Sequence, residues 1–187
     1  EAIKVGTNNK KNASGYDLKN IFIGAEGTLG IMTEVEILLR PRTAYEQSIL
    51  IGFENLDDVT KMIVEILNSN VLPKSLEVLE KDSIATAEKF VGYKLPEVAG
   101  EAHLIMSLDG DNTDVIDAEI ENLRALAQNT NASGFLVLNE EDEKLAWNVR
   151  DNILTAIASS GVWKMYDPVV PNNRIAVGFL IPKSIPI

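Results

Sequence analysis

Three glycines recur at every third position in the segment GAEGTLG, which spans residues 24–30. Glycine lets the backbone adopt a positive φ or approach another group closely, and it leaves main-chain amides open to an anion or a planar ring. The spacing differs from that of the dinucleotide-binding G-x-G-x-x-G motif and of the P-loop, and no helical pattern follows it. The segment therefore predicts either a tight turn or a ligand-contacting loop, in which Glu26 accepts hydrogen bonds.

Arg150 is the side chain best suited to hold a carboxylate. A planar guanidinium binds a carboxylate with two parallel hydrogen bonds. The apolar spacing around Arg150 predicts a helix from about residue 140 to residue 160. The alternative is a surface ion pair with Glu143 or Asp151, which would stabilise the protein only weakly. Residue type alone leaves both interpretations open.

The other groups able to bind metals favour structural roles. His103 is the only histidine and there is no cysteine, and one imidazole cannot make a metal site unaided. Three aspartates, at 109, 111 and 114, lack the spacing of an EF-hand and its terminal glutamate. They predict a helix start, where carboxylates cap the backbone and interact favourably with the helix dipole.

Composition excludes several classes of protein. The chain has 187 residues, of which 45% are hydrophobic, and this suffices for one or two domains with a core. A net charge of -11 argues against a nucleic-acid surface, which needs clustered cations. Without cysteine or a long apolar run, we expect a soluble, cytoplasmic protein, with peripheral attachment to a membrane left open. The chain begins at Glu1 in a polar segment, so we expect an excerpt of a longer protein.

The pattern of apolar residues predicts the elements that position these groups. Residues 21–23 and 31–40 are expected to be strands that flank the glycine turn, and Pro41 ends the second. Alternating strands and helices are expected beyond it, with Asn55 capping the first helix. These elements are a strand at 49–53, a helix at 55–70, a strand at 76–79, a helix at 83–90, a strand at 103–108, a helix at 114–128, a strand at 135–138 and a helix at 140–160.

This order contains the unit strand, helix, strand twice. Right-handed crossovers place both crossover helices on the same side of a sheet. The predicted fold class is therefore α+β, a ferredoxin-like four-stranded antiparallel sheet with helices on one face.

Two longer segments carry a resemblance to a known family. The strings KNASGYDL (11–18) and IFIGAEGTLGIMTE (21–34) closely resemble the end of the FAD-binding domain in the FAD-linked oxidases, which include the glycolate oxidase flavin subunit, D-lactate dehydrogenase and D-2-hydroxyglutarate dehydrogenase. The strings AWNVRD (146–151), YD (166–167) and VVPNNR (169–174) resemble the C-terminal cap domain of the same family. Between these segments only the α+β pattern matches.

The resemblance implies two domains and a flavin. Residues 1–42 would form the C-terminal part of an FAD-binding domain, whose terminal strands precede a truncated cap at residues 43–187. In the family, the segment that matches residues 26–32 lies along the FAD. The expected cofactor contacts are therefore Glu26, Gly27, Thr28, Leu29, Gly30, Ile31 and Met32. Position 25 is often serine in the family and is alanine here, so a hydroxyl contact is lost at Ala25.

The resemblance also implies a substrate contact. Relatives that act on 2-hydroxy acids hold the carboxylate with an arginine on the cap helix, which corresponds to Arg150. Relatives that act on 2-hydroxyglutarate carry a threonine four residues and a lysine fifteen residues after it. Those positions are Leu154 and Met165, and the nearby Thr155 and Lys164 are each displaced by one residue. The resemblance thus leaves Lys164 as a second substrate candidate and does not support a 2-hydroxyglutarate specificity.

The predicted function is that of a fragment of an FAD-dependent oxidoreductase. It would oxidise a 2-hydroxy acid of the glycolate or D-lactate type to the 2-oxo acid by hydride transfer to flavin. The family's N-terminal glycine-rich FAD loop and C-terminal histidine motif are not found, so no catalytic base is assigned. A divalent metal would need residues outside this chain, and we expect the fragment to be inactive alone.

The resemblance allows for an electron-acceptor protein or subunit and for a homo-oligomer. The alternative function is a non-catalytic ferredoxin-like module for ligand binding or oligomerisation, in which the glycine segment is only a turn.

Overall fold

The computed structural model describes residues 2–161, 163 and 169–171. The chain divides into two compact units, Glu1–Pro41 (unit 1) and Arg42–Ile187 (unit 2). Each unit is described by itself.

Unit 1 contains one short helix, α1 (Lys19–Phe22), and no strand among its described residues. The predicted strands at residues 21–23 and 31–40 are therefore wrong. A strand requires a neighbour that takes up its backbone hydrogen bonds, and no described segment pairs with residues 31–40. At residue 23 the backbone instead closes a helical turn, since the amide of Ile23 donates to the carbonyl of Lys19 at 3.1 Å.

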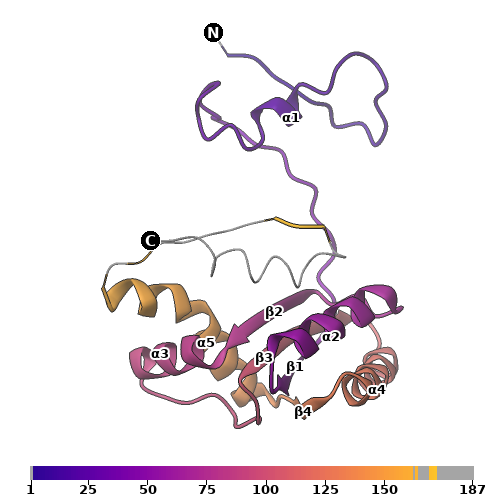
Figure 1. Cartoon of the computed structure of the whole chain (residues 1–187). Helices are drawn as coiled ribbons and strands as arrows, with labels where there is room; N and C mark the ends of the chain where they lie inside the picture. The colour runs from indigo at the N-terminus through magenta and orange to yellow at the C-terminus, as the bar shows by residue number, and fades with distance from the viewer. Residues whose placement is uncertain (1, 162, 164–168, 172–187) are drawn as a thin grey trace. The chain divides into compact units, whose positions relative to one another are not determined.

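Unit 2 contains the predicted succession of strands and helices, with ends that differ from the predicted ones by a few residues (Figure 1). Asparagine caps three of its helices, because the side chains of Asn55, Asn112 and Asn139 accept hydrogen bonds from amides of the following turn. The elements are β1 (Tyr45–Phe53), α2 (Leu56–Asn68), β2 (Ser75–Glu80), α3 (Lys81–Val91), β3 (Ala102–Gly110), α4 (Thr113–Asn129), β4 (Ala132–Val137) and α5 (Glu140–Ser159).

The four strands form one antiparallel sheet in the order β2-β3-β1-β4. Two strand-helix-strand units interleaved in this order make the ferredoxin-like arrangement, so the predicted fold class is confirmed. β1 lies inside the sheet, and β2 and β4 form its edges.

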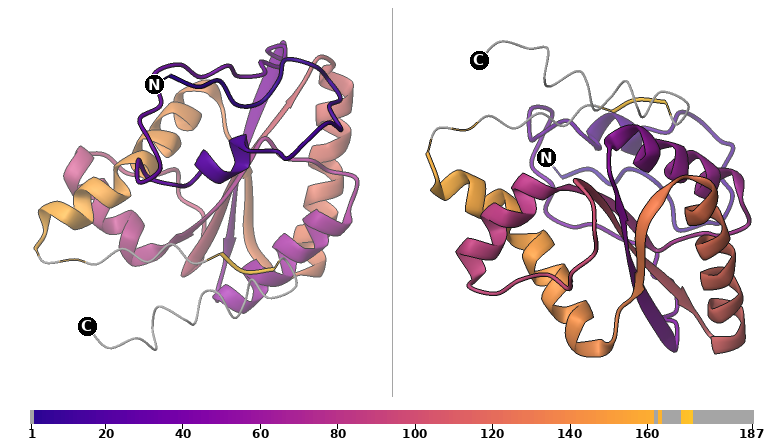
Figure 2. Two further views of the ribbon diagram at one scale, coloured as in Figure 1. Left: turned by 90° about the horizontal axis from the view of Figure 1, so that it is seen from above. Right: turned by 60° about the horizontal axis from the view of Figure 1, so that its bottom comes forward.

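Helices cover both faces of this sheet, as the right-hand view of Figure 2 shows. The crossover helices α2 and α4 share one face, as predicted, and pack on Ile49, Ile51 and Phe53 of β1. The other face is covered by α3 and α5, which pack on Leu50. The expectation of helices on one face thus holds for the crossovers alone, because α3 and α5 have apolar faces of their own to bury.

Two neighbouring glycines of the sheet leave space for the loop between α3 and β3 to pack against the strands. Gly52 of β1 pairs directly with Gly134 of β4. A Cβ at Gly52 would lie 1.9 Å from the carbonyl oxygen of Ala99, and a Cβ at Gly134 would lie 2.7 Å from Val98. The two glycines are therefore required for close packing of the loop.

Candidate functional site

The glycine segment of unit 1 is built from a tight turn over residues 25–28. The amide of Thr28 donates to the carbonyl of Ala25 at 2.9 Å, and the Thr28 hydroxyl donates to the same oxygen at 2.6 Å. The two central residues have positive φ, 49° at Glu26 and 78° at Gly27, as in a type I′ turn. Glycine at position 27 thus serves the conformation of the chain, since a Cβ there would meet nothing within 4 Å.

The same segment presents its backbone to the outside of unit 1. All seven predicted cofactor contacts, residues 26–32, are exposed. Among the described residues, no acceptor is found for the amides of Gly27, Leu29 or Gly30. Amides that lack an acceptor within the unit are suited to a ligand with anionic or carbonyl oxygens. The geometry fits the expected role toward FAD.

Arg150 in unit 2 connects α5 to the edge strand β2. Its Nη2 donates to Glu77 Oε1 at 2.6 Å, and its Nη1 donates to Asp151 Oδ1 at 3.0 Å. The side chains of Arg150 and Glu77 are each 36% exposed. The hydrogen bond to Glu77 is the main cause that raises the pKa of Arg150, with burial opposing it. The guanidinium is a permanent cation, half shielded from water.

A chain of hydrogen bonds lies on the same side of α5. The Trp147 indole donates to Ser48 Oγ at 2.9 Å, and Ser48 donates to Glu143 Oε1 at 2.6 Å. Glu143, Trp147 and Arg150 follow each other at intervals of four and three residues, so they share one helical face. This face of α5 carries the polar groups directed at the sheet.

The sheet meets that face of α5 with further polar side chains. Ser48 of β1 pairs with Ser107 of β3, which pairs in turn with Ser75 of β2. Ser107 donates to Glu46 at 2.8 Å, and Lys74 binds the other oxygen of Glu46 at 2.5 Å. Hydrogen bonding to Lys74, more than to Ser107, lowers the pKa of Glu46.

The predicted site residues fall into different parts of the chain. Of the two partners expected for an Arg150 surface pair, Asp151 is confirmed, whereas Glu143 bonds Ser48 instead. The Arg150 partner on the sheet, Glu77, is missed by the sequence analysis. The sequence signal for Glu77 is its spacing from Leu79. Residues two apart on a strand point to the same face of the sheet, and Leu79 is buried, so the charged side chain of Glu77 lies on a covered face. Lys164 lies outside the described residues.

The remaining sequence candidates have structural partners. His103 is buried, and its Nε2 lies 2.9 Å from the carbonyl oxygen of Val98 in the inserted loop. Asp109 accepts from Thr43 and Asp111 from the amide of Ala44. No cluster of three metal-binding side chains occurs in the part of the chain that the structure describes.

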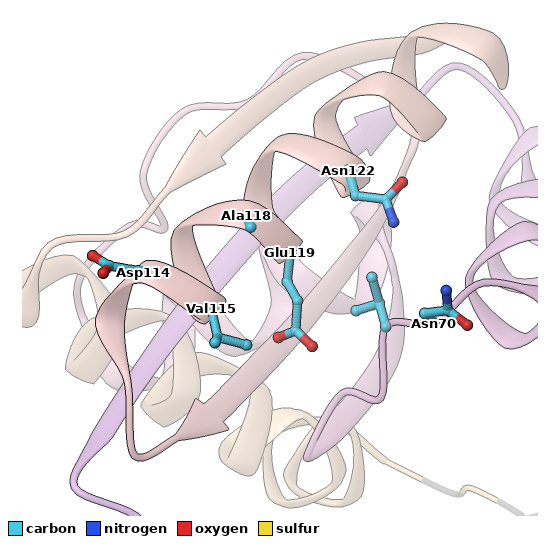
Figure 3. Close-up of a pocket in the computed structure, with 7 residues that line it drawn as sticks. Asn70, Asp114, Val115, Ala118, Glu119 and Asn122 are labelled. Atoms are coloured by element: carbon cyan, nitrogen blue, oxygen red, sulfur yellow. The ribbon is translucent and has the colours of Figure 1, made fainter.

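A shallow hollow of about 400 Å³ lies on the opposite face of the sheet from Arg150, between α4 and the loop after α2 (Figure 3). Glu119 and Asn122 of α4 and Asn70 of that loop line the hollow. Burial, with a smaller contribution from Asp109, raises the pKa of Glu119. The hollow is separate from the Arg150 region.

None of the helices described has the length and apolar character needed to cross a bilayer.

Comparison with known proteins gives a consistent family. Residues 42–178 match the model of the FAD linked oxidases, C-terminal domain. The chain is 33% identical to a D-lactate dehydrogenase of Anaerostipes hadrus, over 99% of this chain and 40% of that protein. It is 29% identical to the Glycolate oxidase subunit GlcD of Bacillus subtilis (strain 168), over 94% of this chain and 37% of that protein. A D-lactate dehydrogenase of Archaeoglobus fulgidus is 30% identical over 93% of this chain and 38% of its own.

The chain thus spans about two fifths of the length of these curated relatives. The match to the family model includes Arg150, the sheet and every helix that the structure describes in unit 2. This chain belongs to the family of FAD linked oxidases and contains their C-terminal domain.

Proposed function

We propose that this chain is part of an FAD-dependent oxidoreductase that oxidises a 2-hydroxy acid of the D-lactate or glycolate type to the 2-oxo acid, by hydride transfer to FAD. Residues 1–42 contribute the end of the flavin domain, and residues 43–187 contribute the cap above the substrate. The observation that carries the proposal is the family match over residues 42–178, together with relatives named D-lactate dehydrogenase and glycolate oxidase subunit.

In this proposal the glycine segment contacts the cofactor. The exposed amides of Gly27, Leu29 and Gly30 donate hydrogen bonds, and the turn at Glu26 and Gly27 holds them in place. FAD supplies the two-electron acceptor that conversion of a hydroxyl to a carbonyl requires.

Arg150 takes the role of carboxylate anchor, and Lys164 is a second candidate for substrate contact. A permanent cation at the boundary of a polar cluster suits a carboxylate ligand. No described residue is assigned as the base that accepts the hydroxyl proton. We further propose that the protein works in the cytoplasm or at a membrane surface and passes its electrons to a separate acceptor protein or subunit.

The test is an anaerobic absorption spectrum of the full-length protein before and after addition of D-lactate, glycolate and D-2-hydroxyglutarate. We expect flavin bands that D-lactate or glycolate bleaches. A colourless protein that takes up no added FAD would contradict the proposal and favour a module without redox chemistry.

The cofactor contact is tested separately with Gly27→Val in the full-length protein. A β-branched residue is strained at φ +78°, and we expect at least a tenfold loss of FAD affinity, since distortion costs about 1–2 kcal/mol before any lost contact. Gly15→Val is the matched control, because Gly15 has φ +76° and equally open surroundings. Equal flavin loss in both variants would show that general strain in unit 1, not contact at residue 27, is responsible.

A further inference from the structure

The cation at Arg150 is already shared by two carboxylates. Glu77 accepts from Nη2 at 2.6 Å and Asp151 accepts from Nη1 at 3.0 Å. The three groups together carry one net negative charge. An incoming carboxylate therefore meets a guanidinium whose attraction is largely cancelled at short range.

The two partners are held very differently. Glu77 lies on β2, where its backbone is fixed by the ladder to Ile105 of β3, and its side chain is 36% exposed. Asp151 is the next residue along α5 and its side chain is 63% exposed. A shielded carboxylate from a rigid strand competes more effectively for the guanidinium than an exposed one beside it.

The planar geometry of the guanidinium also affects the competition between these carboxylates and a ligand for Arg150. A carboxylate binds arginine best through two parallel hydrogen bonds from neighbouring N–H groups. Nη1 and Nη2 each already donate one hydrogen bond, so a ligand carboxylate that approaches these two nitrogens competes with Asp151 and Glu77 for the paired geometry.

We propose that Glu77 is an internal competitor for Arg150, because its carboxylate occupies on the guanidinium the position that a substrate carboxylate takes. The inference rests on the proposed function, because it takes Arg150 to be the carboxylate anchor. Binding of the acid and opening of the Arg150–Glu77 ion pair then form one exchange. The pair keeps affinity for carboxylates low and keeps the guanidinium positioned when no acid is bound.

The test uses the full-length, FAD-loaded protein with Glu77→Gln, and D-lactate and glycolate as ligands. With the flavin reduced beforehand, so that the acids bind without being oxidised, we expect calorimetry to give a Kd about two- to fivefold lower than that of the unchanged protein, the effect of releasing one half-exposed ion pair. We expect KM to fall by the same factor with kcat unchanged. D-lactamide, which lacks the carboxylate, should gain nothing.

Three variants serve as controls. Glu65→Gln changes the net charge equally from the exposed side of α2, on the other face of the sheet, and should leave Kd unchanged. Asp151→Asn should have a smaller effect than Glu77→Gln, because Asp151 is more exposed. Arg150→Met should weaken binding of both acids at least tenfold.

The outcomes separate this inference from the function on which it rests. An unchanged or weaker Kd in Glu77→Gln, with binding still dependent on Arg150, would overturn the competition and leave the function standing. A purely structural ion pair predicts that result, with a lowered melting temperature. Binding of the acids without flavin reduction would overturn the function alone, and binding of neither acid to any variant would overturn both.

Discussion

Residues 31–37 and residues 47–53 both contain segments that the sequence predicts as strands, yet their structures are very different. Ile31, Thr33, Val35 and Ile37 alternate with other residues as regularly as any strand of the protein, yet they form no strand and are exposed. Residues 47–53 belong to β1, which pairs with β3 on one side and β4 on the other. Alternation fixes which side chains share a face, whereas a strand exists only where other segments accept its hydrogen bonds.

The comparison teaches that apolar content and burial are separate properties. Both segments are rich in isoleucine and valine or leucine, but only that of unit 2 is enclosed, between helices on both faces of the sheet. Unit 1 presents its apolar side chains outward in the described structure. In our proposal the remainder of a flavin domain covers them.

The largest expected difference between the units is in the free energy of unfolding that is lost when a leucine is truncated to alanine. Leu104 of β3 is 0% exposed and Leu38 of unit 1 is 100% exposed. In the present chain, we expect Leu104→Ala to lower the free energy of unfolding by about 2–5 kcal/mol and Leu38→Ala to change it by less than about 0.5 kcal/mol. Urea denaturation followed by circular dichroism measures both. A comparable loss in Leu38→Ala would mean that unit 1 buries this side chain in solution.

Substitution of a glycine is expected to have an intermediate effect on stability. The reason for the glycine differs between the two units. Gly52 is required by space, since its Cβ would overlap the Ala99 carbonyl, whereas Gly27 is required by its positive φ. We expect Gly52→Ala to destabilise unit 2 by about 1–3 kcal/mol, the usual cost of overpacking. Gly27→Ala should leave the melting temperature of unit 2 unchanged. A thermal melt that responded equally to both would show that the units unfold together.

The smallest effect concerns acid sensitivity. The pKa of Glu46 in unit 2 is lowered by Lys74 and Ser107, so its ionised form stabilises the folded state. This contribution is present above pH 4.5, the ordinary glutamate value, and is lost as the pH falls through the lower folded-state pKa. In Glu46→Gln, the free energy of unfolding should depend less on pH below pH 4.5. At pH 7 it should be lower by less than about 1 kcal/mol, because the Lys74–Glu46 pair is half exposed.

Asp17→Asn is the matched change in unit 1, where the carboxylate binds Lys19 two residues away. We expect no change in the acid midpoint of unit 2. A shift as large as that of Glu46→Gln would show that the two units unfold together.

Local signals explain how much of the fold follows from sequence. Asn55 followed by apolar residues at helical spacing predicts α2, and the succession of elements predicts the ferredoxin-like sheet. The second helical layer is missed, because the spacing of Ala146 and Val149 on α5 shows an apolar face without showing which face of the sheet it meets.

The candidate site follows from sequence only in part. The chemistry of Arg150 and the turn at Gly27 can be inferred from residue type and spacing. The partner of Arg150 cannot, because Glu77 lies 73 residues earlier in the chain and comes close only through the packing of α5 on the sheet. The same holds for Ser48, whose bond to Trp147 joins residues 99 positions apart.

The interior position of β1 also affects synthesis on the ribosome. β1 is complete at Phe53, but its neighbours in the sheet begin at Ala102 and Ala132. A nascent chain therefore carries an apolar strand with both edges open until β3 has emerged and with one edge open until β4 has emerged, and α2 shields only one of its faces. We expect newly made chains to need protection from aggregation until the last strand closes the sheet.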